Sequence, residues 1–540
     1  MTGSGIRRAG VRGGGALILI LLLALFIVPL LRLLALPLLH PSPPIGAWRP
    51  VWDSLILALL TASIAAPLGG GLAWLITAYQ GWIATLAALT LWALFLAPSY
   101  VLTTGWIILF STPQTRLTLI GHGFFGLAGL LMLFVIKALP FVSFVTRATL
   151  SSVGAGLGEA ALIHNLSRFR RLRIMLRLIA PALALGFAVA VIETMQEFGI
   201  PASLGTASKI PLLTYAIYQR LAETPTDFTG AALLCWRLVL IAAVVGVASL
   251  AAQRRGANLR SGRTRPVLRR RPGLLVTLLS AAVVVSLLTL GVLIPSACLL
   301  LRGFGQGWQS TPHLGAVLRS LGFGIIGASL ATGTGIALLR LRKAGRSLLT
   351  TTIDAALLAN MAVPGLVLGA SYILTFNNNF LPLYGTTALL IIAYAAGTIP
   401  LASRMVQGAF ADLDRTLDEA ARIHGLSVST RAIDISASLL AQPLLYGLLI
   451  ATSAIMFELP ISELLYPPGA TPLGVAIVGL DQMGSLGAAA RLATLGIIAI
   501  TGLAGFLLSL LSVVRLLTTR TMTSPMTNTM IRRALTDPSQ

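Results

Sequence analysis

The chain contains the stretch EAALIHNLS at Glu159–Ser167 and the stretch EAARIHGLS at Glu419–Ser427. Seven of the nine positions are identical, and the two stretches lie 260 residues apart. Six further pairs of identical residues keep a spacing of 260 to 266 residues: Pro140 with Pro400, Ser143 with Ser403, Pro181 with Pro443, Glu197 with Glu458, Ser54 with Ser320 and Pro98 with Pro364. The sequence therefore indicates two tandem copies of one unit.

The unit is apolar enough to lie in a membrane. Hydrophobic residues make up 56% of the 540 residues, charged residues only 10%, and the mean hydropathy is +0.89. A soluble chain carries about 25% charged residues, so this composition excludes one large soluble enzyme, a disordered chain and a disulfide scaffold. A membrane-spanning helix needs about 20 apolar residues. Twelve segments qualify: 16–38, 53–78, 84–110, 124–146, 176–197, 229–252, 274–301, 315–339, 348–376, 384–406, 438–458 and 490–514.

These spans predict an all-α polytopic membrane protein built from two tandem six-helix units. We expect the first unit at 1–252, a basic linker at 253–273, the second unit at 274–518 and a cytoplasmic tail at 519–540. Each unit has a long loop between its fourth and fifth helices, at about 149–175 and about 407–436. An even number of helices per unit makes the two copies parallel. A pathway through the membrane is expected at their interface.

The excess of cations is explained by membrane topology. Lys and Arg number 39 against 16 Asp and Glu, a net charge of +23, which in a soluble protein would suggest nucleic-acid binding. With the N-terminus inside, 29 cations fall in the predicted cytoplasmic segments and six in the outer ones. This asymmetry follows the positive-inside rule with both termini cytoplasmic. The charge then indicates contact with lipid headgroups and no nucleic-acid partner.

The N-terminus and the two cysteines add little. Arg7, Arg8 and Arg12 precede an apolar run, as in a signal peptide. The run at 16–38 is longer than a signal core, and no A-x-A site closes it, so we expect a first span that is not cleaved. Cys235 and Cys298 lie in apolar runs and are expected to be small core residues rather than a disulfide.

The repeated motif E-A-A-x-x-x-G on these loops resembles the signature of binding-protein-dependent ABC importer permeases. Glu419–Gly425 fits the motif fully, whereas the first copy has Asn165 in place of Gly. Glu-Ala-Ala favours a helix, and Gly, or Asn in its place, can end it in a left-handed conformation. The resemblance implies that this short helix docks on an ATPase subunit. The alternative, a purely structural helix-turn-helix loop, is disfavoured because the motif recurs at a matching position in both copies.

The residues that the resemblance assigns to ATPase coupling are Glu159, Ala160, Ala161, Asn165, Glu419, Ala420, Ala421 and Gly425. Three more stretches narrow the resemblance to ferric-iron-type permeases: 97–100 (APSY), 197–218 (beginning EFGIP) and 458–469 (beginning ELP). Two fused halves of this kind are similar to iron(III) and thiamine import permeases, which implies the type I ABC importer fold. It also implies a multi-pass protein of the bacterial inner membrane.

Three acidic residues are candidates for the pathway. Glu197 and Glu458 lie at equivalent positions near the outer ends of the fifth and eleventh predicted helices. Glu193, four residues before Glu197, can share its helix face. Charges at membrane depth usually face a water-filled path or a partner, and this set would suit a cationic solute or a gate. The alternative is that they cap or brace the helix ends.

Lys137, Pro98 and Pro364 lie inside predicted spans. Lys137 is expected to have a structural role, reaching the interface or pairing with a carboxylate, rather than contacting solute. Pro98 and Pro364 can free backbone carbonyls for the pathway or merely bend their helices. His164 and His424 occupy equivalent loop positions, but no ligand cluster surrounds either in the sequence, so we predict no metal site.

The chain lacks the sequence G-x-x-x-x-G-K-[ST], so we expect no ATP hydrolysis by the usual phosphate-binding loop and no catalytic residues. ATP and Mg²⁺ would belong to a separate subunit. The resemblance therefore implies an importer permease with two ATPase copies and an extracytoplasmic solute-binding protein. Ferric iron is the favoured solute, with thiamine, polyamines and phosphonates behind it. A twelve-helix secondary transporter driven by an ion gradient is the alternative, and a membrane enzyme or channel is a third.

Overall fold

A computed structural model describes residues 23–39, 48–150, 167–257, 271–305, 307–344, 351, 353–354, 357, 363–411, 419–421, 423–425, 427 and 438–522. We call the described residues up to Ala257 the first half and those from Arg271 the second half. All regular secondary structure in these ranges is helical, so the predicted all-α membrane fold is confirmed.

The first half contains η1 (Leu23–Ile27), α2 (Val28–Leu39), α3 (Trp48–Ala78), α4 (Trp82–Leu96), α5 (Ser99–Leu109), α6 (Pro113–Arg116), α7 (Leu119–Phe124), α8 (Leu127–Leu150), α10 (Arg168–Gln196), α11 (Gly199–Ser208), α12 (Leu213–Ala222) and α13 (Phe228–Ala257). The second half contains α14 (Leu274–Leu288), η2 (Thr289–Leu293), α15 (Ile294–Phe304), α16 (Ala316–Ala344), α18 (Gly365–Phe376), α19 (Thr387–Ala411), α22 (Ser438–Met456), α23 (Pro460–Leu465), α24 (Leu473–Gln482) and α25 (Leu486–Met522).

In the described part of the chain, nine uninterrupted stretches are long and apolar enough to cross a membrane. Each corresponds to one of the twelve predicted spans. A tenth predicted span, 84–110, is found as a broken helix, in which α4 and α5 meet at an angle of 97°. Pro98 cannot donate a backbone hydrogen bond, and it disfavours a helical conformation for the residue before it. Predicted spans 16–38 and 348–376 are described only in part, as the short apolar stretches Ala24–Leu39 and Gly365–Phe376.

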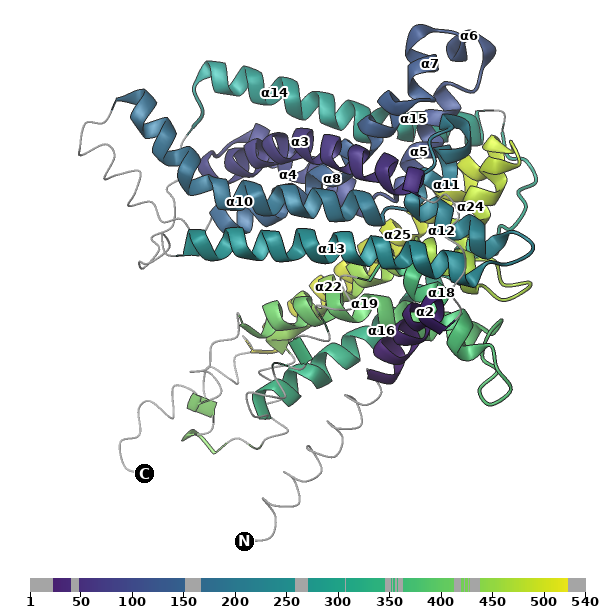
Figure 1. The fold of residues 1–540 in the computed structure, drawn as a ribbon. Coiled ribbons are helices and arrows are strands. Elements are labelled where there is room, and N and C mark those ends of the chain that lie inside the picture. Colours follow the sequence, from purple (N-terminus) through teal and green to yellow (C-terminus); the bar gives the residue numbers. More distant parts are fainter. Residues whose placement is uncertain are drawn as a thin grey trace, which may run out of the picture.

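The two halves repeat the same packing. Helix α3 packs against α8 and α10, just as α16 packs against α19 and α22, and α12 packs on α13 as α24 packs on α25. Two short helices contact the opposite half: α2 of the first half contacts α18, and α15 of the second half contacts α5. Figure 1 shows the long helices of both halves diverging from a common end, where α11, α12, α18 and α24 lie.

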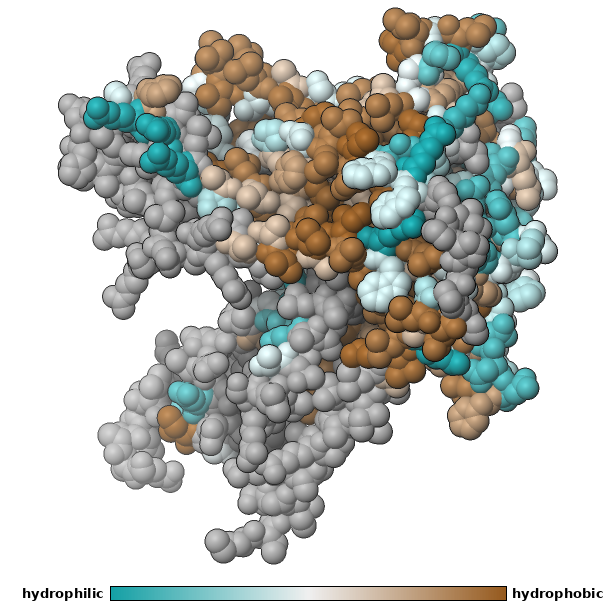
Figure 2. All heavy atoms as spheres, viewed as in Figure 1, coloured by the Kyte–Doolittle hydropathy of each residue, from teal (hydrophilic) through white to brown (hydrophobic). Residues whose placement is uncertain are grey.

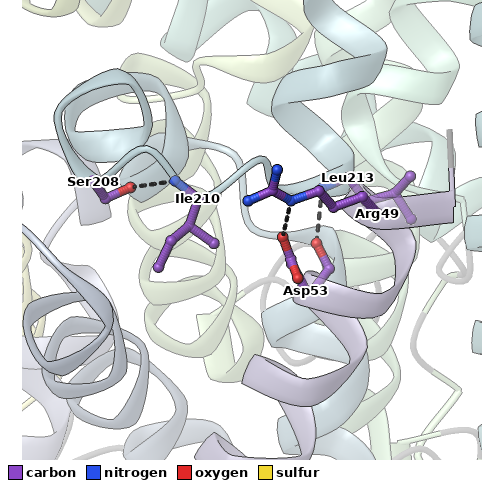
Figure 3. A network of polar contacts seen from close by, with 6 residues as sticks. Arg49, Asp53, Ser208, Ile210 and Leu213 are labelled. Carbon is purple, nitrogen blue, oxygen red and sulfur yellow. Dashed lines mark hydrogen bonds and ion pairs between the residues drawn. The ribbon is translucent and has the colours of Figure 1, made fainter. Parts of the chain in front are cut away.

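Two serines found as a repeat pair have the same role in the two halves. The amide of Leu213, at the start of α12 and labelled in Figure 3, donates to the hydroxyl of Ser54 at 2.7 Å. The amide of Leu473, at the start of α24, donates to the hydroxyl of Ser320 at 2.7 Å. The first amides of a helix have no partner within it, so each serine fixes a short helix onto a long one. Figure 3 also shows the neighbouring Arg49–Asp53 ion pair on α3.

The surface has the pattern of a protein that crosses a membrane. Figure 2 shows hydrophobic side chains over the middle of the long helices around α3 and α14, and hydrophilic ones gathered toward both ends of these helices. Helix α14 is an example, since the side chains of Leu274, Leu275 and Leu279 are 76%, 70% and 61% exposed. Exposed leucines in this number are stable when they face lipid.

Candidate translocation cavity

A cavity of about 420 Å³ lies between the two halves, and we call it the central cavity. Its wall includes four predicted pathway residues, Pro98, Glu193, Glu197 and Glu458, together with Lys137. The fifth predicted residue, Pro364, is buried beside it, and the following residue, Gly365, lines the cavity. The structure thus brings the candidates from both halves to one place.

The break at Pro98 places a free carbonyl at the cavity. Ala97 and Pro98 are both extended, with ψ of 125° and 138°, so the helix hydrogen-bond ladder stops there. The Lys137 ammonium on α8 donates to the Ala97 carbonyl oxygen at 2.7 Å. The lysine therefore has a backbone partner, not the carboxylate considered from the sequence. Pro364, with φ −60° and ψ 146°, gives α18 the same kind of start that Pro98 gives α5.

Glu197 caps the short helix α11. One of its carboxylate oxygens accepts a hydrogen bond from the Gly199 amide at 2.7 Å and another from the Ser99 hydroxyl at 2.6 Å. These bonds join α10, α11 and the start of α5. A Cβ atom at position 199 would lie 2.3 Å from the Ser99 hydroxyl oxygen, so a larger residue there would displace this hydroxyl from Glu197. Glu193, one helical turn earlier, interacts electrostatically with both Glu197 and Lys137.

Glu458 caps the short helix α23 in the second half. Its carboxylate accepts hydrogen bonds from the Ile461 amide at 2.7 Å, the Ser462 amide at 2.9 Å and the Ser462 hydroxyl at 2.8 Å. A carboxylate at a helix N-terminus also interacts favourably with the helix dipole. Glu197 and Glu458 thus brace helix ends, as the alternative interpretation held, and they line the cavity as well. The two interpretations are compatible.

Contacts between the halves close one end of the molecule. The Thr104 hydroxyl on α5 donates to the Asp481 carboxylate on α24 at 3.1 Å. The Tyr218 hydroxyl on α12 donates to the Glu463 carboxylate on α23 at 3.0 Å, and burial raises the pKa of Glu463 to about 7. Gln482 on α24 donates to the carbonyl of Ala202 on α11 at 3.1 Å. Helices α5, α11, α12 and α24, which carry most of these residues, lie at the common end in Figure 1.

Sequence reasoning missed these interface residues. Asp481 and Glu463 could have been noticed, because acidic residues within apolar segments are rare in a chain with only 16 Asp and Glu. Their hydroxyl partners, Thr104 and Tyr218, carry no comparable signal. The four short helices α11, α12, α23 and α24 were also missed, because helices of six to ten residues show too little periodicity.

The second E-A-A loop is partly described. Glu419–Ala421 is helical, the His424 amide donates to the Ala420 carbonyl at 3.0 Å, and Gly425 follows with φ of +73°. Glycine ends a helix in this left-handed conformation at little cost. Ala421 is buried, whereas Ile423 is 85% exposed. The first copy, with Glu159, Ala160, Ala161, His164 and Asn165, lies outside the described residues.

No group of three His, Cys, Asp or Glu side chains with the geometry of a metal site occurs among the described residues. Cys235 is buried and Cys298 is half-buried, and both are free thiols. The central cavity therefore presents carboxylates, one ammonium and backbone carbonyls. Such groups can interact with a passing charge.

Residues 58–256 match the family described as "Binding-protein-dependent transport system inner membrane component". The putative ferric transport system permease of Haemophilus influenzae is 25% identical over 318 residues, which cover 55% of this chain and 50% of that protein. The ferric transport system permease of Actinobacillus pleuropneumoniae is 24% identical over 329 residues, 57% of this chain and 47% of that protein. A probable ABC transporter permease of Sinorhizobium fredii is 28% identical over 188 residues, 33% of this chain and 31% of that protein.

The chain thus spans about half the length of the first two relatives. No solved structure matches it. The family match falls on the first half, where α3 to α13 lie, and the second half repeats its packing. The resemblance noted from the E-A-A motif is confirmed: residues 58–256 match the family of binding-protein-dependent transport permeases, and the chain is similar to two ferric transport system permeases.

Proposed function

We propose that this chain is the membrane-spanning permease subunit of an ABC importer and that the central cavity is its translocation pathway. The observation that carries the proposal is the position of the cavity. It lies at the interface of two repeated halves, and it is lined by residues from both. The family match and the two E-A-A stretches support the same assignment.

The arrangement of the halves fits one state of an alternating-access cycle. Their contacts concentrate at the end with the short helices, and the long helices diverge toward the other end (Figure 1). We assign the closed end to the outer face, in agreement with the charge distribution of the sequence. ATP binding would draw the two E-A-A loops together, open the outer end and admit solute from a binding protein.

We propose ferric iron as the solute, because the two relatives named as ferric transport permeases cover more of the chain than the third. Thiamine, polyamines and phosphonates remain competitors to be tested. Uptake of radioactive ferric iron and of thiamine can be compared in bacteria that lack their own importers. Iron uptake that depends on this chain, without thiamine uptake, supports the assignment. The reverse result overturns the solute but not the transporter class.

The partners are proposed as two ATPase copies, one on each E-A-A loop, and an extracytoplasmic solute-binding protein. The chain would lie in the bacterial inner membrane with both termini in the cytoplasm. The exposed Ile423, next to the helical turn of Glu419–Ala421, offers an apolar contact to the ATPase. The Ile423→Asp substitution should therefore weaken the complex.

The decisive experiment is gentle purification of the tagged chain from its own cells, followed by identification of bound subunits. We expect an ATPase subunit to be present, and deletion of 419–425 to release it. The matched control for Ile423→Asp is Phe380→Asp, which changes an apolar residue that is 94% exposed on a loop assigned to the outer face. This control should keep the ATPase bound. Transport that proceeds without any ATPase, and that collapses with an ionophore, would instead establish the secondary transporter.

A further inference from the structure

We propose that Lys137 is a tethered counter-cation of the central cavity. Without solute, its positive charge partly neutralises the carboxylates of Glu193 and Glu197. A cationic solute that passes through the cavity replaces Lys137 in this interaction. This inference deepens the proposed function and rests on it for the direction of transport. It names the class of solute that the cavity accepts, a cation, and one residue that determines it.

The position of Lys137 is the first step of the argument. It is half-buried on α8, in the middle of a helix that can cross the membrane, where an ammonium group is costly. Its hydrogen bond goes to the neutral Ala97 carbonyl at 2.7 Å. None of the salt bridges among the described residues includes Lys137. The ammonium is thus held at the cavity wall without being locked to a carboxylate.

The neighbouring charges are the second step. Lys137 interacts electrostatically with Glu197 and Glu193, and all three side chains line the cavity. One positive charge therefore stands against two carboxylates in the first half. In a site shielded from water, removal of that positive charge leaves a strong attraction for another cation.

The second half shows that the fold does not require this lysine. Gly397 lies three residues before Pro400, as Lys137 lies three residues before Pro140. A Cβ atom on Gly397 would meet the Ile461 side chain at 3.2 Å, so an apolar residue fills that space. The second half therefore builds the corresponding corner without a lysine.

The acidic neighbour is missing from the second half too. Ala454 lies four residues before Glu458, where the first half has Glu193 four residues before Glu197. Ala454 lines the same cavity. Lysine and second acid thus occur together in one half and are absent together from the other. This joint occurrence is expected if Lys137 neutralises the charge of Glu193. It would be a coincidence if Lys137 only donated a hydrogen bond to the Ala97 carbonyl.

The test is cation binding to the purified chain with its bound subunits in detergent. Mn²⁺ is the probe, and its free concentration is followed by electron paramagnetic resonance. We expect Lys137→Met to bind Mn²⁺ about tenfold more tightly than the natural chain, and Lys137→Met with Glu193→Gln to return close to it. Lys209→Met, which removes an exposed lysine at the end of α11, is the matched control and should change nothing.

Unchanged Mn²⁺ affinity in a folded Lys137→Met chain overturns the proposal. If that variant fails to fold, the variant Lys137→Gly with Glu193→Ala, which copies the second half, decides the matter. Folding of the paired variant supports compensation of Glu193 by Lys137. Its failure to fold shows instead that Lys137 is needed for packing and overturns the proposal. Because binding is measured without ATP or a binding protein, this result is independent of whether an ATPase co-purifies.

Discussion

The corner between α10 and α11 and the corner between α22 and α23 show one backbone design with two different sets of charges. In both, a glutamate follows a long helix and caps the next short helix, Glu197 for α11 and Glu458 for α23. In both, an extended proline starts a neighbouring helix. Only the first corner adds Lys137 and Glu193. We therefore propose that the shared features serve the fold, whereas the added charges of Lys137 and Glu193 interact with solute.

The largest effect is expected at Glu458, whose carboxylate accepts three hydrogen bonds from Ile461 and Ser462. Glu458→Ala should cost about 3 kcal/mol, since hydrogen bonds to a charged group are the strong ones. The melting temperature in detergent and the uptake rate should both fall clearly. A variant with the natural melting temperature would show that the second corner is not held by its glutamate.

Glu197→Ala should cost less, about 2 kcal/mol, because its carboxylate accepts two hydrogen bonds, from Ser99 and Gly199. A third variant, Ser99→Gly, removes one of these two bonds and gives the first corner the residue that the second corner has at the equivalent position, Gly365. That change should cost only about 1 kcal/mol. Melting curves of the three variants, measured side by side, should rank Glu458→Ala lowest. The opposite ranking would contradict the account of the two corners.

The paired serines test whether the halves are mechanically equivalent. Ser54→Ala and Ser320→Ala each leave a buried helix amide without its acceptor, at a cost of about 1 kcal/mol. The two variants should lower the melting temperature by similar amounts. Ser63→Ala on the exposed side of α3 is the control, because its hydroxyl bonds only within its own helix. A large difference between Ser54 and Ser320 would show that the repeat in structure is not a repeat in stability.

The smallest effect is expected at Gly425, whose φ of +73° suits glycine. A left-handed alanine costs roughly 1–2 kcal/mol, but an exposed loop can avoid most of this cost by relaxing, so Gly425→Ala should weaken ATPase binding only a few-fold. Binding can be measured by titrating purified ATPase onto the chain. Gly408→Ala on α19, with open space around its Cβ position and no left-handed φ, is the control and should bind normally.

Much of this fold could be predicted from the sequence, because membrane spans carry a strong signal. Long apolar runs located ten of the twelve proposed spans, and the repeat with its spacing of 260 to 266 residues paired Ser54 with Ser320, Pro98 with Pro364 and Glu197 with Glu458. The assignment of the E-A-A residues to ATPase coupling, the unit boundaries and the orientation stay predictions.

The remaining features depend on tertiary contacts that leave no local pattern. The sequence indicated that Pro98 can bend its helix, but not that the bend reaches 97°, because the neighbouring helices determine the angle. The partner of Lys137 is a backbone carbonyl, which no side-chain pattern reveals. The contacts of α2 and α15 with the opposite half could not be predicted either, since apolar residues that face lipid and those that face protein have the same composition.

The central claim, that solute passes between the two glutamate corners, is tested most directly by solute uptake in a chain with Glu197→Gln and Glu458→Gln together. Glutamine keeps the shape and one acceptor oxygen of each cap but removes both charges. The account predicts a chain that expresses normally, keeps its ATPase and loses most of its uptake. Uptake at the natural rate in that variant would contradict it.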